Sequence, residues 1–312
     1  MLVTLLLAIL PIVVTLGLGY WAGWRQQFPI NTSDVLIQLV MVYALPLSLF
    51  GGILTLKRQA ILQNLTVAAW LAVGMLGGLI VLVILQRLGG QNLASATLNA
   101  LSIASPSVPF IGTSVLLIVF GQISVLLVAL GGLYMNLIQV PISVFLLTLV
   151  DKDATASRWQ VMGRTLLASS KQPVVWAPIL AFGLNLTGLK LAKQWLTLFT
   201  ELGQAAGGVA LFAVGLILSA HQLSFTWPII RNVGLKNLVL PLTIWLGMHL
   251  MGTTLLTQQL VVITLAIPSA TIPTMLAVRQ QLPADDYVAT QLLSTVLAPI
   301  TMGVLMLGLR IV

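Results

Sequence analysis

The sequence predicts an all-α polytopic membrane protein with ten transmembrane helices in two inverted repeats of five helices. Three observations support this fold class. Of the 312 residues, 59% are hydrophobic and only 6% are charged, whereas soluble domains carry roughly 25% charged residues. The apolar residues form about ten runs near the roughly 20 residues that a bilayer-spanning helix needs. Landmarks in the two halves of the chain also recur at one constant spacing.

The constant spacing between these landmarks is 162 residues. It separates Pro11 from Pro173, Leu49-Phe50 from Leu211-Phe212, and Pro106-Ser107 from Pro268-Ser269. We therefore expect a first repeat over residues 1–150, a linker over 151–172 and a second repeat over 173–312. Five spans per repeat is an odd number, so the second repeat must enter the membrane from the opposite side. The repeats are therefore expected to be inverted.

The ten expected spans are separated by short polar segments. They cover residues 2–23, 35–56, 64–85, 97–119, 122–150, 173–188, 195–220, 237–256, 258–279 and 287–310. The linker is the one long polar segment, and Trp159, Met162 and Leu166 have helical spacing within it. We expect a short amphipathic helix on the membrane surface there, either as a plain connector or as an element that senses lipids or a partner.

The distribution of lysine and arginine predicts the orientation, because cytoplasmic loops are enriched in these residues. The net charge of +8 is therefore assigned to loops rather than to nucleic-acid binding. One side of the membrane receives nine of the basic residues: Arg25, Arg87, Lys152, Arg158, Arg164, Lys171, Arg231, Lys236 and Arg279. The other side receives five: Lys57, Arg58, Lys190, Lys193 and Arg310. We expect the first side to be cytoplasmic, with both termini outside and the linker inside.

Two proline-containing stretches are expected to break a transmembrane helix near its centre. Residues 105–114 read SPSVPFIGTS and residues 267–275 read IPSATIPTM. The predicted helix-breaking residues are Pro106, Pro109, Pro268 and Pro273. Proline lacks an N–H group and clashes with the carbonyl four residues earlier. Lipid cannot satisfy the freed backbone groups, so each break must be buried or line a wet cavity. Two breaks at matching positions indicate the binding site of a transporter.

Hydroxyl side chains gather at these breaks and predict the site residues. Ser105, Ser107, Thr113, Ser269 and Thr271 carry donors that suit a bound carboxylate. The half-helices that start after each break present free N–H groups and a positive dipole end, which favour an anion. Ser107 and Ser269 occupy equivalent positions in the two repeats. The alternative is that these hydroxyls, Thr113 above all, only cap loose backbone groups beside a kink.

A few other polar side chains lie within the expected spans. Asn136 and Gln139 share one face of the fifth span, and Asn136 is a candidate for substrate binding, with helix–helix hydrogen bonding as the alternative. His249 is either a structural residue or a proton relay, and Glu201 is either an interface anchor or a coupling group. The other carboxylates fall in loops or at span ends. The chain therefore lacks the buried carboxylate expected of a sodium or proton site, and without cysteine it has no thiolate metal site.

The order and spacing of several motifs resemble the auxin efflux carrier family over nearly the whole chain. The motifs are ALPLSLF at 44–50, the stretch 106–114, QPVVWAP at 172–178, LFAVG at 211–215, AIPSATIPTMLA at 266–277 and QLLST at 291–295. The resemblance implies ten spans in two inverted repeats with spans 4 and 9 crossed, as in bile-acid symporters and sodium/proton antiporters. It also implies a scaffold of spans 1, 2, 6 and 7, often dimeric, and a transport part of spans 3–5 and 8–10.

This chain departs from the family pattern at the first break. The family commonly has asparagine where Ser107 stands and proline where Ser114 stands. The predicted site therefore carries fewer amides than is usual, and its substrate is not copied from a relative.

These expectations together predict a secondary transporter of the cytoplasmic (inner) membrane. It would move a small organic anion, a mono- or dicarboxylate, by alternating access, with the membrane lipids and a second copy of the chain as partners. No cofactor, metal or nucleic acid is expected. The alternatives are a proton- or sodium-coupled carrier of the same architecture and a receptor that transports nothing. An embedded enzyme is disfavoured because no cluster of His, Asp and Glu lies at membrane depth.

Overall fold

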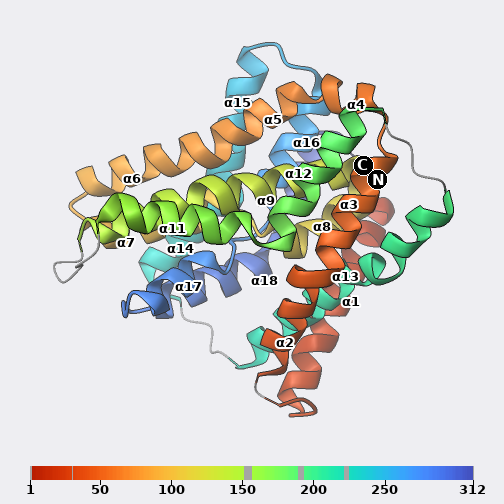
Figure 1. The fold of residues 1–312 in the computed structure, drawn as a ribbon. Helices are drawn as coiled ribbons and strands as arrows, with labels where there is room; N and C mark the ends of the chain where they lie inside the picture. Colours follow the sequence, from red (N-terminus) through yellow and green to blue (C-terminus); the bar gives the residue numbers. More distant parts are fainter. Residues whose placement is uncertain (1, 30, 151–156, 189–192, 221–224, 312) are drawn as a thin grey trace.

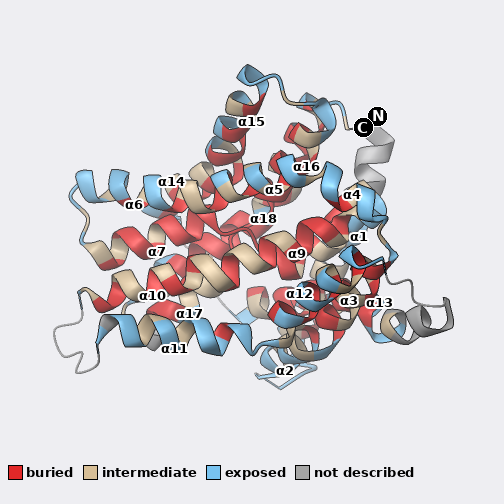
Figure 2. Ribbon diagram, turned by 45° about the horizontal axis from the view of Figure 1, so that its top comes forward, coloured by how far each residue is buried: buried red, intermediate tan, exposed pale blue. Residues whose placement is uncertain are grey.

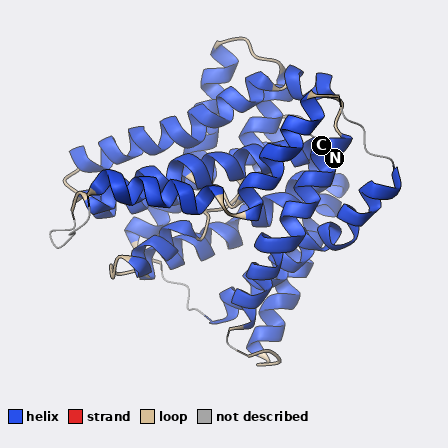
Figure 3. Cartoon of the chain, in the orientation of Figure 1, coloured by secondary structure: helices blue, strands red, loops and turns tan. Residues whose placement is uncertain are grey.

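The computed structural model describes residues 2–29, 31–150, 157–188, 193–220 and 225–311, and the regular elements in these ranges are helices (Figure 3). Six of the described segments are long and apolar enough to cross a membrane: Thr32–Thr55, Leu65–Leu88, Val108–Thr148, Glu201–Ala220, Trp227–Leu250 and Asp285–Gly308. Three shorter apolar helices accompany them: Leu93–Ala104, Pro173–Leu186 and Leu255–Ala266. The expectation of an all-helical, multi-pass membrane protein is confirmed.

The helices follow one another with short connections (Figure 1). The first half contains α1 (Leu2–Trp24), α2 (Thr32–Leu39), η1 (Val40–Ala44), α3 (Leu45–Thr55), α4 (Arg58–Gln63), α5 (Leu65–Ala72), η2 (Val73–Gly77), α6 (Gly78–Leu88), α7 (Leu93–Ala104), η3 (Val108–Gly112), α8 (Thr113–Phe120), η4 (Gly121–Ile123), α9 (Ser124–Tyr134), η5 (Met135–Gln139) and α10 (Val140–Thr148). The second half contains α11 (Arg158–Ser170), α12 (Pro173–Leu186), α13 (Lys193–Ala220), α14 (Trp227–Gly234), η6 (Leu235–Val239), α15 (Leu240–Leu250), α16 (Leu255–Ala266), α17 (Ile272–Arg279) and α18 (Asp285–Gly308). The expected linker helix is α11, while linker residues 151–156 lie outside the described residues.

Several long helices contain a five-residue π-helical turn, and three of these turns come just before a proline. The prolines are Pro46 after η1, Pro141 after η5 and Pro241 after η6. A proline cannot donate a hydrogen bond to the carbonyl four residues earlier. The wider π-helical turn changes the hydrogen-bond register before the proline, so the missing donor is accommodated without ending the helix. A single proline is therefore accommodated here, whereas the closely spaced proline pairs lie where two other helices are interrupted.

Burial follows the position of each helix in the bundle. Buried residues concentrate along α7, α9 and α18 in the middle of the molecule, and exposed residues line the outer helices (Figure 2). The outer faces keep large apolar side chains exposed, such as Ile80 and Ile84 on α6 and Ile300 and Val304 on α18. Exposing such side chains to water is unfavourable. Their surroundings are therefore expected to be the hydrocarbon of the bilayer.

One group of helices packs through direct backbone contact. α1 and α13 lie side by side, together with α2 and α3 (Figure 1). A Cβ atom on Gly19 of α1 would collide with the carbonyl oxygen of Phe212, and one on Gly215 of α13 would collide with the carbonyl oxygen of Leu16. Small residues let membrane helices approach closely and gain packing contacts along their length. The glycines therefore fix α1 against α13.

A buried amide holds α12 against the end of α3. The Nδ2 group of Asn185 donates to the carbonyls of Ile53 at 2.9 Å and Leu56 at 2.8 Å. The carbonyls lie at the carboxyl-terminal end of α3: that of Ile53 also accepts from the N–H of Leu56 at 3.1 Å, whereas that of Leu56, the residue after the helix, has no backbone donor among the described residues. Asn185 thus caps α3 from a helix that lies 129 residues or more further along the chain.

The helix expected as the eighth span begins about ten residues earlier than expected. The sequence places it at 237–256, but the continuous helix α14–η6–α15 runs from Trp227 to Leu250. Two cations, Arg231 and Lys236, reduce the hydropathy of its first half and make that half look like a loop. Lys236 is fully buried in the middle of the helix, so its expected place in a cytoplasmic loop is wrong.

Candidate functional site

Two helices are interrupted at their centres. The first interruption, residues 105–107, lies between α7 and η3, and the second, residues 267–271, lies between α16 and α17. We refer to these two segments as the paired breaks. Two of the predicted helix-breaking prolines, Pro106 and Pro268, lie within the paired breaks. The other two, Pro109 and Pro273, occupy the second position of the helical segment that follows each break, where a missing N–H group costs little.

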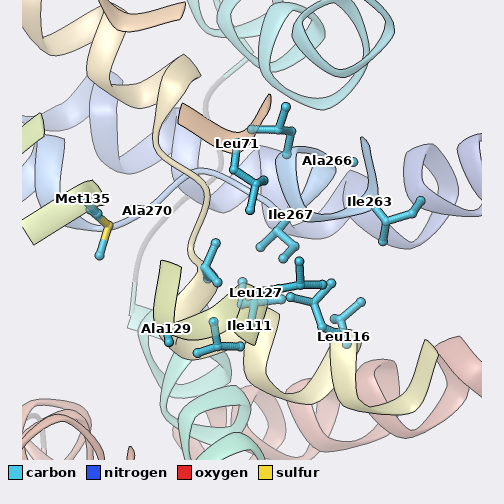
Figure 4. Packing of buried hydrophobic residues seen from close by; sticks show 14 of the residues in the cluster. Leu71, Ile111, Leu116, Leu127, Ala129, Met135, Ile263, Ala266, Ile267 and Ala270 are labelled. Atoms are coloured by element: carbon cyan, nitrogen blue, oxygen red, sulfur yellow. The ribbon is translucent and has the colours of Figure 1, made fainter. Parts of the chain in front are cut away.

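The paired breaks hydrogen-bond to each other as a short antiparallel bridge. The N–H of Ser107 donates to the carbonyl of Pro268 at 2.7 Å, and the N–H of Ala270 donates to the carbonyl of Ser105 at 2.9 Å. Ile267, the first residue of the second break, is part of the main buried apolar cluster (Figure 4). Each break therefore satisfies part of the backbone that the other exposes, as a lipid-surrounded protein requires.

Gln139 secures the end of α7 at the first break. Its Nε2 group donates to the carbonyls of Ala104 at 3.1 Å and Met75 at 2.8 Å, and its Oε1 atom accepts from the Ser105 hydroxyl at 2.8 Å. All of these groups are buried. Gln139 thus connects three segments of the first half: η2, the end of α7 and η5. The Ser105 hydroxyl is used inside the protein, as the capping alternative expects.

A second polar network surrounds Ser269. Its hydroxyl donates to the carbonyl of Ser102 at 2.7 Å, and its N–H donates to the hydroxyl of Ser294 at 3.2 Å. The Ser294 hydroxyl donates to Oδ1 of Asn237 at 2.6 Å, and Nδ2 of Asn237 donates to the Thr301 hydroxyl at 3.3 Å. This network ties the second break to α7, α18 and η6. Neither Asn237 nor Ser294 is among the residues predicted from the sequence.

The other predicted residues of the first half differ in their partners. Thr113 donates to the carbonyl of Pro109 at 2.8 Å, which is backbone capping. Asn136 donates through Nδ2 to the carbonyl of Gly132 at 2.9 Å within its own helix. Ser107 is only 3% exposed, and its hydroxyl has no hydrogen-bond partner in the described part of the chain. Of the predicted hydroxyls at the first break, the Ser107 group is therefore available to a ligand.

The start of α17 presents unpaired donors. The backbone N–H groups of Thr271, Ile272 and Thr274 have no acceptor among the described residues. The hydroxyl oxygen of Thr274 is buried and also lacks a partner. The Thr271 hydroxyl accepts a hydrogen bond from Nε2 of Gln291 at 3.0 Å. A helix start with free N–H groups carries a partial positive charge, to which an anion is well matched.

Lys236 is the functional candidate that the sequence reasoning missed. It is fully buried in η6, and its Nζ group donates to the carbonyl of Leu265 at 2.7 Å. Leu265 lies in the last turn of α16, just before the second break. The 162-residue spacing was the signal that could have found it, because it carries the expected third span at 64–85 onto 226–247 and so places Lys236 inside the membrane.

The carboxylates of the described residues lie away from the paired breaks. They occupy first turns of helices or an exposed position on α13: Asp34, Glu201, Asp285 and Asp286. Lys190 and the side chains of Lys193 and Trp195, which precede Glu201 in the sequence, lie outside the described residues. His249 is exposed near the end of α15 and stacks on Trp245 at 5.6 Å between ring centroids. Within the described ranges, no three His, Cys, Asp or Glu residues gather as metal ligands.

A cleft opens beside the starts of α7 and α18. Its volume is about 630 Å³. The lining includes Asn92 and Ser95 from the start of α7, Asp286 and Tyr287 from the start of α18, and Val150 after α10. These elements also carry residues of both polar networks, because α7 leads to the first break and α18 carries Ser294. The cleft therefore lies at the amino-terminal ends of α7 and α18, the two helices that also contact the paired breaks.

Comparison with known proteins assigns the class. A family model described as a membrane transport protein matches residues 4–306. The chain belongs to this family, and the expected membership of the auxin efflux carrier family is confirmed. The transporter YfdV of Escherichia coli K12 is 33% identical over 268 residues, which is 84% of each chain. The YfdV proteins of Escherichia coli O157:H7 and Shigella flexneri match to the same extent.

Proposed function

We propose that this membrane transporter moves a small organic anion with a carboxylate group, bound at the paired breaks. The observation that carries the proposal is the set of unpaired donors at the start of α17. Three backbone N–H groups and the Thr274 hydroxyl lack partners among the described residues. A carboxylate has two oxygens that accept several hydrogen bonds, and the buried Thr274 hydroxyl is a polar group that is costly to leave without a partner. An anion at this position would satisfy them.

The surroundings of the paired breaks oppose cation binding. A sodium or proton site in a membrane helix normally uses a buried carboxylate, and the described Asp and Glu residues lie at helix starts or on an exposed face. The side chains that do face this region are hydroxyls, amides and the Lys236 ammonium. The alternative of a sodium-coupled carrier therefore has less support than anion transport.

The arrangement of elements supports two repeats related by 162 residues. This offset carries α5, η2, α6 and α7 onto α14, η6, α15 and α16 with identical bounds. We propose a first repeat over residues 1–150, a linker over 151–172 and a second, inverted repeat over 173–312. With five spans in each repeat, the segments interrupted at the paired breaks are spans 4 and 9 of ten. Both termini then lie outside the cytoplasm.

We further propose that transport occurs by alternating access in the inner membrane. The closely packed helices α1, α2, α3, α12 and α13 are the scaffold and the surface for a homodimer. The helices that carry the two polar networks move against this scaffold. The cleft beside Asn92 and Ser95 is then the cytoplasmic entrance, because it lies on the same side as the linker. Support comes from the glycine-mediated contact of α1 with α13, which suits a rigid unit.

The experiment is a flux assay with the purified protein in liposomes. Labelled malonate, malate, lactate and an aromatic acid are offered, with a quaternary amine as the cation control. We expect uptake of at least one acid and none of the amine. Ser107→Asp should abolish uptake because it sets a like charge against the substrate. Ser107→Ala should cost about 1–2 kcal/mol, the scale of one hydrogen bond to a charged group.

Two matched substitutions make this assay specific. Ser170 is an exposed serine on α11, so Ser170→Asp and Ser170→Ala should leave uptake unchanged. If only the amine moves, or if Ser107→Asp carries acids as fast as the unmodified protein, the assignment of the substrate class or of the site is wrong.

A further inference from the structure

A lysine lies fully buried at the centre of a transmembrane helix. Lys236 belongs to the continuous segment Trp227–Leu250 and has 0% of its surface exposed. A charged side chain within the membrane is costly, and such residues commonly mark a substrate or ion pathway. Its position therefore needs a physical explanation beyond packing.

The ammonium group of Lys236 lies beside the second break. η6 packs against α7 and α18, which carry residues of the Ser269 network, and against α16, which leads into the second break. The Nζ group donates to the carbonyl of Leu265 at 2.7 Å, two residues before Ile267 begins the break. An ammonium has three donors, and this is its one hydrogen bond in the described part of the chain. No described carboxylate forms an ion pair with it.

The opposite half of the molecule shows that capping a broken helix here does not require a charge. At the first break, the neutral amide of Gln139 donates to the carbonyl of Ala104 at the end of α7. The residue 162 positions before Lys236 is Gly74, so the first half has no cation at the equivalent place. Lys236 thus performs the capping that a glutamine performs in the other half, and it adds a positive charge.

The charge of Lys236 is not balanced within the described residues around the breaks. The carboxyl-terminal end of α16 contributes a partial negative charge, and the start of α17 contributes a partial positive charge of similar size. These two contributions largely cancel, whereas the ammonium charge remains. In a region of low dielectric constant, such a charge acts strongly on a nearby ligand.

We propose that the Lys236 ammonium is the fixed positive charge that makes the paired breaks select an anion, and that the carboxylate of the substrate balances this charge while bound. This inference rests on the proposed function. It divides the work of the site between two features: the donors at the start of α17 orient the carboxylate, and Lys236 sets the sign of the charge that is accepted.

The test separates the charge of Lys236 from its hydrogen bond. Lys236→Arg keeps the charge, Lys236→Gln keeps an N–H donor without the charge, and Lys236→Met removes both. In liposomes, we expect Lys236→Arg to keep anion uptake, while Lys236→Gln and Lys236→Met raise KM at least tenfold. Arg231→Gln is the matched control, because it removes a half-buried cation from the same helix. Its KM should stay within about twofold of the unmodified protein, as expected for a change away from the site.

The outcomes distinguish this inference from the proposed function. If the unmodified protein carries no organic anion, the proposed function fails. If the protein carries an anion and Lys236→Gln does so with unchanged KM, only the role of Lys236 is overturned, and the lysine is merely a cap.

A second variant covers the case in which Lys236→Gln does not fold. Asn237→Asp is nearly isosteric and places a negative charge on the neighbouring residue, which offsets the charge of Lys236. Folded Asn237→Asp should also show at least a tenfold higher KM for the anion. Uptake by this variant with unchanged KM would overturn the inference.

Discussion

Replacing Gln139 by leucine tests how the first break is held in place. Leucine keeps most of the side-chain volume but has no amide. The carbonyl of Ala104 then loses its donor and the Ser105 hydroxyl loses its acceptor, whereas the Met75 carbonyl still accepts from the N–H of Gly78. Because Gln139 is fully buried, water cannot easily take over these hydrogen bonds. Two buried polar groups are therefore left without a partner.

The expected magnitude follows from these two groups. A buried polar group without a partner costs about 1–3 kcal/mol. A hydrogen bond between membrane helices contributes about 0.6 kcal/mol on average, because the unfolded reference state also finds partners. At about 1 kcal/mol for each group, the free energy of unfolding should fall by about 2 kcal/mol. With about 2–4 °C in Tm for each kcal/mol, Gln139→Leu should lower Tm by about 4–8 °C.

The assay is thermal unfolding of the detergent-solubilised protein, followed by tryptophan fluorescence. Gln160→Leu is the matched control, because Gln160 is exposed on α11. A surface substitution changes stability by at most about 0.5 kcal/mol, so the control should shift Tm by about 2 °C or less. If Gln139→Leu melts at the same temperature as Gln160→Leu, the amide does not hold the end of α7, and the reasoning is refuted.

Three further predictions concern packing and orientation. Gly19→Ala should destabilise the protein by about 1–3 kcal/mol, because the added Cβ overpacks against the Phe212 carbonyl. Gly17→Ala is the control and should be neutral or stabilising, because its added Cβ meets nothing within 4 Å. Equal melting temperatures of the two variants would contradict the close contact of α1 with α13. Asn185→Ala should lower the free energy of unfolding by about 1–3 kcal/mol, because the Leu56 carbonyl at the end of α3 loses its donor. An unchanged midpoint in a thermal melt would argue against this cap. A single cysteine at Gln160, in a chain without native cysteine, should resist an impermeant thiol reagent in intact cells and react after permeabilisation. Labelling of intact cells would reverse the predicted orientation.

The interrupted helices follow from local physics. The two prolines of a pair lie three or five positions apart, so two N–H donors are missing and one wide turn cannot compensate for both. The single prolines Pro46, Pro141 and Pro241 were not expected to sit beside π-helical turns, because nothing in the local sequence separates a kink from a widened turn. The ends of the other expected spans lie within a few residues of helix ends in the structure, because the apolar runs end where polar connections begin.

Lys236 was assigned to a loop for an equally physical reason. A basic residue near an apolar run reads the same in sequence whether it ends the run or lies inside it. Its burial depends on a tertiary contact, the carbonyl of Leu265 at the end of α16. The repeat spacing indicates that Lys236 lies inside a span, because it transfers the bounds of the well-defined third span, 64–85, to residues 226–247.

The predicted site residues divide in a way that sequence alone could not resolve. Ser105, Thr113 and Ser269 use their hydroxyls in internal hydrogen bonds, while the Ser107 hydroxyl remains unpaired in the described chain. Hydroxyl rotamers and their acceptors depend on how the two breaks meet, which periodicity does not specify. The free donors at the start of α17 have the same origin. Their identity follows from the length of the second break rather than from any residue type.

The most direct measurement is a structure of the protein bound to a brominated carboxylate that it transports. The bromine marks the ligand by its anomalous scattering, and the carboxylate position follows from the density. We expect the carboxylate oxygens within hydrogen-bond distance of the N–H groups of Ile272 and Thr274, on the side of the paired breaks that faces Ser107. A carboxylate found in the cleft beside Asn92 and Ser95, with nothing at the start of α17, would contradict the proposal that this transporter binds its substrate at the paired breaks.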